Sequence, residues 1–197
     1  GPNANWGMRQ LQAYVESKDI PLSHVLVTSI DCDHRIDKEY LHALTYFYLV
    51  CPERKYTSFQ PIAMFTNNIW DVPAPMRVIA TGNSFWNMIV SQRQHILRNF
   101  ASHAQPLDAL VDTNFYTTRS IVEDGHQYWR TYFRFEGRHE VFPLMTPIYQ
   151  DAVLAGSLKK TIFEQFKQLR RWAYGASDVP YVAYTGFFKK NSISKTD

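Results

Sequence analysis

The spacing of apolar residues predicts a chain in which strands and helices alternate. Residues 25–30, an apolar run rich in β-branched side chains, predict a buried strand. Over residues 38–50 the apolar side chains recur three and four positions apart, which predicts a helix capped by Asp37. Residues 57–65 predict a second strand, and Pro61 within it indicates a sheet edge or a bend.

The rest of the chain continues the alternation. A modest helical pattern at residues 8–15 precedes the first strand. After the second strand we expect, in order, a loop at 70–78, a helix at 84–100 capped near Asn83 or Ser84, a strand at 113–122, a helix at 123–132 and a short strand at 140–145. Ser157 then caps a last helix, which runs to Tyr174 and is closed by Gly175.

The composition is that of a globular domain. Of 197 residues, 45% are hydrophobic and 20% are charged, which is enough apolar surface for one sizeable core. The net charge is only +3 and most basic residues are scattered, so a nucleic-acid partner is not indicated. No apolar run reaches the roughly 18 residues needed to cross a bilayer. The two cysteines, Cys32 and Cys51, indicate free thiols and a cytoplasmic location.

Two acids follow the first predicted strand. In open α/β sheets, ligands collect at the carboxyl ends of strands, and Asp31 and Asp33 come directly after residues 25–30. One or two carboxylates are the usual protein ligands of a hard divalent cation that neutralises phosphate charge. The pair therefore indicates a cation site, with a solvated acidic turn or a helix cap as the alternative.

A second acidic pair, Glu123 and Asp124, opens the helix predicted over residues 123–132. A carboxylate within hydrogen-bond reach of a hydroxyl can act as a general base and take its proton. The alternative is that both acids only compensate the helix dipole, which favours negative charge in the first turn.

A third group lies near the end of the last predicted helix. Gln168, Arg171 and Trp172 stand at positions i, i+3 and i+4, which puts them on one helical face. An Arg side chain can hold phosphate oxygens in a forked geometry, and a Trp ring offers a flat surface for a sugar. The alternative for Trp172 is core packing, because it continues an apolar stripe through Ile162 and Phe166.

In this order, D-C-D at 31–33, E-D at 123–124 and Q-L-R-R-W at 168–172 resemble the DxD, ED and QxxRW motifs of the inverting family 2 glycosyltransferases. This group includes the cellulose, chitin and hyaluronan synthases. The resemblance implies an α/β fold with a GT-A-like (Rossmann-like) mixed sheet flanked by helices. It also implies transfer of a sugar, with inversion, from a nucleotide-sugar donor, expected to be UDP-linked, to a glycan or lipid acceptor.

The resemblance implies a role for each matching residue. Asp33 together with Asp31 would hold Mg²⁺ or Mn²⁺, and Asp124 would be the catalytic base. The residues implied to bind substrate are Asp31, Glu123, Gln168, Arg171 and Trp172.

The family's early Asp, with the strands that carry it, has no counterpart ahead of Asp31, so the resemblance implies an incomplete sheet. We expect residues 1–24 to be a lead-in, made of a Gly-Pro cleavage remnant and a helix. Residues 25–180 would be the C-terminal part of the catalytic domain, and residues 181–197 a tail suited to a membrane interface. Activity should be weak or absent unless a second chain, or a swapped partner in an oligomer, supplies the missing half. The parent protein would lie in the cytoplasm or be anchored at the cytoplasmic face of a membrane.

Two other functions stay open at this point. One is a non-catalytic binding or scaffold module that keeps the fold without turnover. The other is a metal-dependent phosphoesterase that uses Asp31 and Asp33 with the neighbouring histidines His34 and His126, although their spacing matches no zinc signature.

Overall fold

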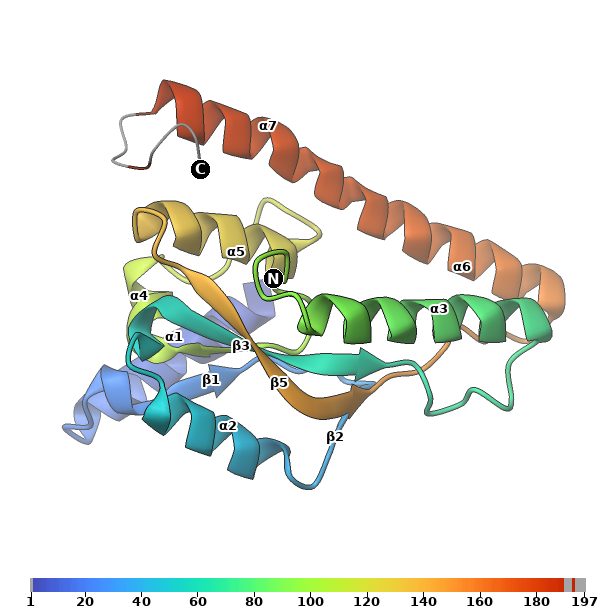
Figure 1. The fold of residues 1–197 in the computed structure, drawn as a ribbon, viewed down its shortest axis with the longest axis horizontal. Helices are drawn as coiled ribbons and strands as arrows, with labels where there is room; N and C mark the ends of the chain where they lie inside the picture. The colour runs from blue at the N-terminus through green and yellow to red at the C-terminus, as the bar shows by residue number, and fades with distance from the viewer. Residues whose placement is uncertain (1, 190–192, 194–197) are drawn as a thin grey trace.

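The computed structural model describes residues 2–189 and residue 193 (Figure 1). Five strands form one mixed, strongly curled sheet in the order β1-β4-β3-β5-β2. Their bounds are β1 Leu26–Thr28, β2 Arg35–Ile36, β3 Thr57–Met64, β4 Ala104–Pro106 and β5 Glu140–Tyr149. The two long strands, β3 and β5, pair in parallel, and the other pairs are antiparallel. The fold is thus mixed α/β, as expected, but its strand order is not a clear Rossmann order, because only one pair of strands runs parallel.

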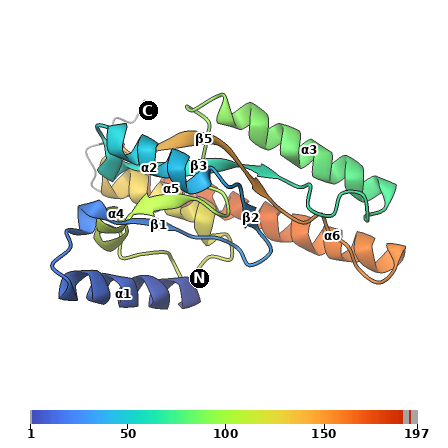
Figure 2. The same cartoon turned by 90° about the horizontal axis from the view of Figure 1, so that it is seen from below.

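Helices cover both faces of this sheet. They are α1 Pro2–Ser17, α2 Tyr40–Val50, α3 Ala74–Ser91, α4 Leu107–Asp112, α5 Glu123–Arg134, α6 Leu158–Ala173 and α7 Asp178–Ala183. Figure 1 shows α2 on one face and α5, with the rod formed by α6 and α7, on the opposite face. Figure 2 shows α1 and α3 on opposite sides of the molecule. The sheet is therefore enclosed, while the α6–α7 rod lies outermost.

The main core lies between α2 and the two central strands. Tyr40, Leu44 and Tyr48 recur four residues apart on α2 and pack against Phe59 of β3 and Ile148 of β5. A second cluster joins α1 to α4 through Met8, Val15, Leu107 and Leu110. The helical spacing predicted for residues 38–50 is confirmed by this buried face.

Several predicted elements are confirmed within a few residues of their ends. The predicted helix at 123–132 is α5, and the predicted strand at 140–145 is the first part of β5. Ser157 caps α6 as expected, because its Oγ accepts a hydrogen bond from the Lys160 amide at 3.3 Å. The predicted cap at Asp37 is wrong, because Glu39 occupies the cap position of α2 without a side-chain cap hydrogen bond, and Asp37, two residues earlier, accepts from the Glu39 amide at 2.9 Å.

The predicted loop at 70–78 and the helix at 84–100 are wrong in their bounds. Helix α3 begins at Ala74, because Pro75 stands in its first turn, where a missing amide hydrogen costs nothing. It ends at Ser91, so residues 92–100 lie outside it. Ser84 is therefore not a cap. Its hydroxyl donates to the Ala80 carbonyl inside the helix and accepts from the Phe65 amide at 2.9 Å.

Three further predictions need correction. Residues 113–122 contain no strand, and Asn114 and Phe115 have left-handed φ angles of 55° and 58° that turn the chain after α4. Pro61 does not place the whole of β3 at an edge, because β3 lies between β4 and β5. However, within the described part of the chain β4 pairs with β3 only at Phe59, so β3 is open on that side at Pro61, and the expected bend is present as a register shift at Pro61/Ile62. Gly175 does not close the last helix, because a 3₁₀ turn, Tyr174–Ser177, continues the rod into α7.

The predicted tail at 181–197 is described only in part. Its first residues extend α7 into a π-helical turn, Tyr184–Phe188, whose Tyr184, Phe187 and Phe188 side chains are exposed. Residues 190–192 and 194–197 lie outside the described residues. No helix among the described residues has the length and apolarity that a bilayer span requires.

Candidate functional site

A cleft of about 870 Å³ lies where the three sequence motifs meet. It is bounded by the turn after β1, by residues 101–103, by the start of α5 and by the second half of α6. All residues predicted to act at the site line it, and these are Asp31, Asp33, Glu123, Asp124, Gln168, Arg171 and Trp172. Segments that are more than a hundred residues apart in the sequence thus share one cavity.

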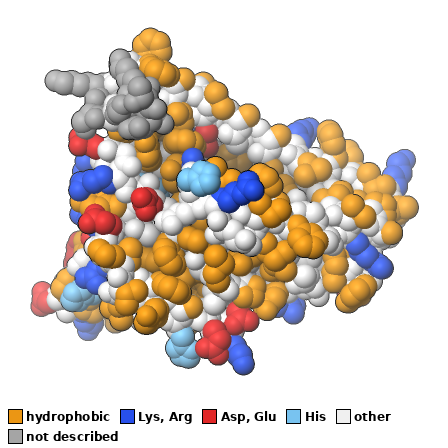
Figure 3. All heavy atoms as spheres, in the orientation of Figure 1, with side chains coloured by type: hydrophobic (Ala, Val, Ile, Leu, Met, Phe, Trp, Pro, Cys, Tyr) orange, Lys and Arg blue, Asp and Glu red, His pale blue; other side chains and the backbone are white. Residues whose placement is uncertain are grey.

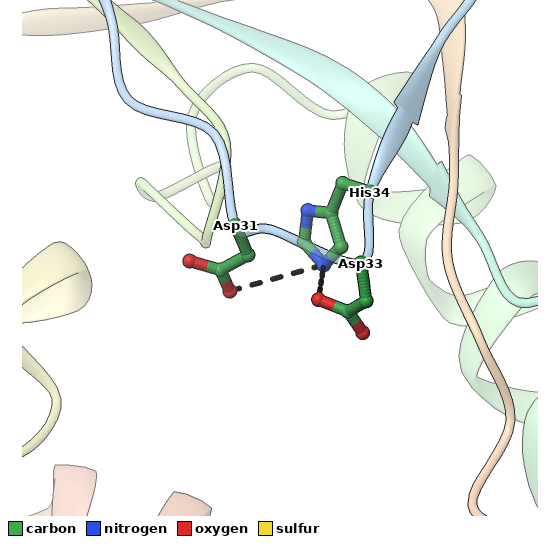
Figure 4. A group of neighbouring side chains, drawn as sticks. All are labelled: Asp31, Asp33 and His34. Carbon is green, nitrogen blue, oxygen red and sulfur yellow. Dashed lines mark ion pairs between the residues drawn. The ribbon is translucent and has the colours of Figure 1, made fainter.

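The acidic turn between β1 and β2 forms one wall of the cleft. Figure 4 shows the imidazole of His34 between the carboxylates of Asp31 and Asp33. His34 Nε2 lies 3.8 Å from Asp31 Oδ2 and 3.8 Å from Asp33 Oδ1. These separations are ion-pair rather than hydrogen-bond distances. The His34 side chain is only 5% exposed, whereas both carboxylates face solvent.

These three side chains fit a divalent cation. Each offers one ligand atom, and the three atoms lie within 4.8 Å of one another. Two carboxylates suit Mg²⁺ or Mn²⁺, and an added imidazole favours a transition ion such as Mn²⁺. Sequence reasoning had assigned His34 only to the phosphoesterase alternative, although its place directly after D-C-D was the signal that it belongs to this group.

The second motif opens α5 and brings a partly buried carboxylate, that of Asp124, to the cleft. Burial raises the pKa of Asp124, and the charges of Glu123 and Asp31 act in the same direction. Its Oδ1 still accepts a hydrogen bond from the Gly125 amide at 2.8 Å, which holds the carboxylate in place. A carboxylate with a raised pKa binds a proton more readily, which suits a general base.

Glu123 differs from its neighbour in its electrostatic surroundings. Burial acts to raise the pKa of Glu123, but hydrogen bonds to its carboxylate, one of them from its own amide, and to a smaller extent the charge of Arg171 bring it below its ordinary value. The ionised form of Glu123 is therefore favoured. The electrostatic contact between α5 and α6 links the second motif to the third.

The third motif lies on the inner face of α6. Gln168, Arg171 and Trp172 all line the cleft, as their spacing predicted. Trp172 is 37% exposed, and its ring centroid lies 6.3 Å from that of Phe65. The apolar stripe that suggested core packing is itself exposed at Ile162 and Phe166. The structure thus leaves the Trp172 ring available at the cleft.

A second cavity, of about 470 Å³, adjoins the first. Asp124 and Trp172 line both cavities, so they stand at the junction. The second cavity is also lined by two further indole rings and four side-chain amides, contributed by Trp86, Trp129, Asn83, Asn87, Asn99 and Gln150. Asn99 is buried, and its Nδ2 has no hydrogen-bond partner within residues 2–189 and 193. Figure 3 shows a hollow beneath the α6–α7 rod with apolar side chains around it.

His126 does not join the acids of the first cleft. Its Nδ1 lies 2.5 Å from Asp178 Oδ1, and its ring packs edge-on against Tyr181, so it ties α5 to α7. His126 is not among the described residues that line either cavity. A site that uses both histidines with Asp31 and Asp33 is therefore not what the structure contains.

Neither the comparison with protein-family models nor that with curated proteins finds a match for this chain. The assignment of a function consequently rests on the three motifs and on the geometry of the two cavities.

Proposed function

We propose that this protein is an inverting glycosyltransferase. It would move a sugar from a UDP-linked donor to a glycan or lipid acceptor with the help of a divalent cation. The observation that carries the proposal is the single cleft that gathers a potential cation site, a partly buried carboxylate, an arginine and an exposed indole. Each of these groups meets one demand of the reaction.

The donor would lie in the first cleft with its diphosphate beside the acidic turn. Asp31, Asp33 and His34 would hold Mg²⁺ or Mn²⁺, and the bound cation would neutralise the negative charge that grows on the leaving diphosphate. Arg171 adds a positive charge from the opposite wall and can donate two parallel hydrogen bonds to phosphate oxygens.

The acceptor would enter through the second cavity. A hydroxyl that approaches from there meets Asp124 at the junction, while the donor occupies the other side. Asp124 would take the proton as the hydroxyl attacks the anomeric carbon from the face opposite the diphosphate, which inverts the configuration. The indole rings and amides of this cavity favour a glycan, because aromatic faces stack on sugar rings and amides bond to hydroxyls.

Calorimetry with UDP in the presence and absence of Mn²⁺ tests the proposal. We expect binding that depends on Mn²⁺ and that Asp33→Ala weakens. A divalent cation and a carboxylate about 4 Å apart in water attract by about 2 kcal/mol, which corresponds to about 30-fold in affinity. Asp151→Ala is the matched control, because Asp151 is an exposed acid of the same cleft outside the Asp31, Asp33 and His34 group.

UDP binding that does not depend on Mn²⁺ would contradict the proposal, as would equal losses of UDP affinity in Asp33→Ala and Asp151→Ala. No binding of either ligand would favour a scaffold module without turnover.

A metal-dependent phosphoesterase is the second candidate, because the His34 imidazole lies between two carboxylates. It predicts hydrolysis of simple phosphate esters with Mn²⁺ and no effect of Trp172→Ala. A glycosyltransferase should not hydrolyse simple phosphate esters, and its activity should fall in Trp172→Ala.

A further inference from the structure

We propose that Ser102 is a positioning residue for the cation site: its hydroxyl holds the imidazole of His34 so that Nε2 faces the Asp31 and Asp33 carboxylates. This inference rests on the cation site of the proposed function and adds to it a residue from another part of the chain. Ser102 belongs to none of the three motifs and lies in the segment just ahead of β4.

The contacts of Ser102 reach both the backbone and the side chain of the acidic turn. Its Oγ lies 2.5 Å from His34 Nδ1 and accepts a hydrogen bond from the Asp31 amide at 3.4 Å. The residue is 3% exposed, so water does not compete for these bonds. One hydroxyl thus ties the start of the turn to its end.

The backbone around Ser102 keeps that hydroxyl in place. The Ser29 amide donates to the carbonyl of His103 at 3.1 Å, which joins the segment to the chain just after β1. Ser102 itself has a φ of 64°, in the left-handed region that residues with a Cβ seldom adopt. A strained conformation of this kind persists only where the surroundings enforce it.

Because an imidazole ring is rigid, the contact between Ser102 Oγ and His34 Nδ1 also fixes the orientation of the ring. Its two nitrogens point in different directions, so a bond at Nδ1 fixes where Nε2 points. Here Nε2 points between the two carboxylates, as the dashed lines in Figure 4 show. If the ring were free to turn, the site would lose one of its three potential ligand atoms.

A hydroxyl suits this task because it can both donate and accept. A cation at the site needs a lone pair on Nε2, so Nδ1 must then carry the proton and donate to Ser102 Oγ. Without a cation, a proton on Nε2 is favoured by the two carboxylates, and Ser102 then donates to Nδ1. The same side chain supports the ring in both tautomers.

The test compares Ser102→Ala and Ser102→Gly with wild type in two measurements. Mn²⁺ affinity, followed by the loss of the free-ion electron paramagnetic resonance signal, should fall about 10- to 100-fold in both variants. NMR relaxation of the His34 imidazole in the metal-free protein should show a fixed ring in wild type and a mobile ring in both variants. The glycine variant matters because glycine adopts a left-handed φ without strain, so it keeps the fold if alanine does not.

Ser91→Ala is the matched control. Ser91 is equally buried, but its hydroxyl donates to the Asn87 carbonyl within α3, and Ser91 is not among the described residues that line either cavity. The inference is overturned if the His34 ring is as ordered in the Ser102→Gly variant as in wild type, or if the Mn²⁺ affinity of that variant equals that of the Ser91→Ala variant. Failure of wild type to bind Mn²⁺ would instead remove the cation from the proposed function, and this inference with it. Binding lost in Asp33→Ala but retained in both Ser102 variants would refute the role of Ser102 alone.

Discussion

Replacement of Arg171 by lysine tests whether the cleft grips a diphosphate by geometry or only by charge. Lysine keeps the positive charge but lacks the planar fork that donates two parallel hydrogen bonds. If Arg171 holds phosphate oxygens through that fork, Arg171→Lys should weaken diphosphate binding even though the net charge of the cleft is unchanged.

The expected magnitude follows from one lost hydrogen bond to a charged group. Such a bond contributes about 1.5–3 kcal/mol, or about 10- to 150-fold in affinity. Arg171 lies in the last turn of α6 and is exposed, so solvent screens the interaction and the lower end of this range applies. We therefore expect a loss of about 10-fold.

The neighbouring Arg170 provides the control. Successive residues of a helix point about 100° apart, and Arg170 is not among the described residues that line the cleft. Calorimetry with inorganic pyrophosphate and Mn²⁺ measures the grip on the diphosphate without a contribution from the nucleoside. Equal affinities in wild type and Arg171→Lys, or equal losses in Arg170→Lys and Arg171→Lys, would refute a forked contact at Arg171.

Three further predictions concern stability. Burial raises the pKa of Asp124, so above about pH 4 the ionised form of Asp124 destabilises the folded state. Asp124→Asn should therefore raise the melting temperature at pH 7 but not well below pH 4. An equal rise in melting temperature at the two pH values would contradict this role of burial. Burial lowers the pKa of His103 to about 4 and that of His139 to about 3. Between about pH 6.5 and about 4 the unfolded chain therefore binds more protons than the folded chain, and stability should fall on acidification through this range by roughly 1 kcal/mol per pH unit for each histidine. Denaturant titrations at several pH values should show a shallower dependence of stability on pH in His139→Gln. Phe59 has no exposed surface, so Phe59→Ala should lower the free energy of unfolding by about 3–5 kcal/mol, and a loss below about 1 kcal/mol would contradict its place in the main core.

The parts of the site that follow from local geometry could be predicted from the sequence. The i, i+3, i+4 spacing places Gln168, Arg171 and Trp172 on one face of any helix, whatever that helix packs against. The acids of the first two motifs follow a strand and open a helix, so their positions at element ends were also predictable. These are short-range consequences of the backbone.

The parts that depend on distant segments could not be predicted in the same way. Nothing near Ser102 in the sequence shows that it contacts His34, because that contact depends on β4 pairing with β1. The second cavity depends likewise on α3, whose start was hidden by the prolines at 73 and 75. Residues 113–122 have strand-like composition, but tertiary contacts bury Phe115 and Tyr116 in a turn instead.

The parallel pairing of β3 with β5 has a consequence for how the protein forms. Thr57 of β3 pairs with Glu140 of β5. The chain must therefore close a long loop before the first contact between these two strands forms, which slows folding. During synthesis, β3 has one unpaired edge until β5 has left the ribosome, and α6 is synthesised only after β5. Chains that stop short of residue 140 should therefore aggregate through β3, and the cleft should be the last part of the molecule to mature.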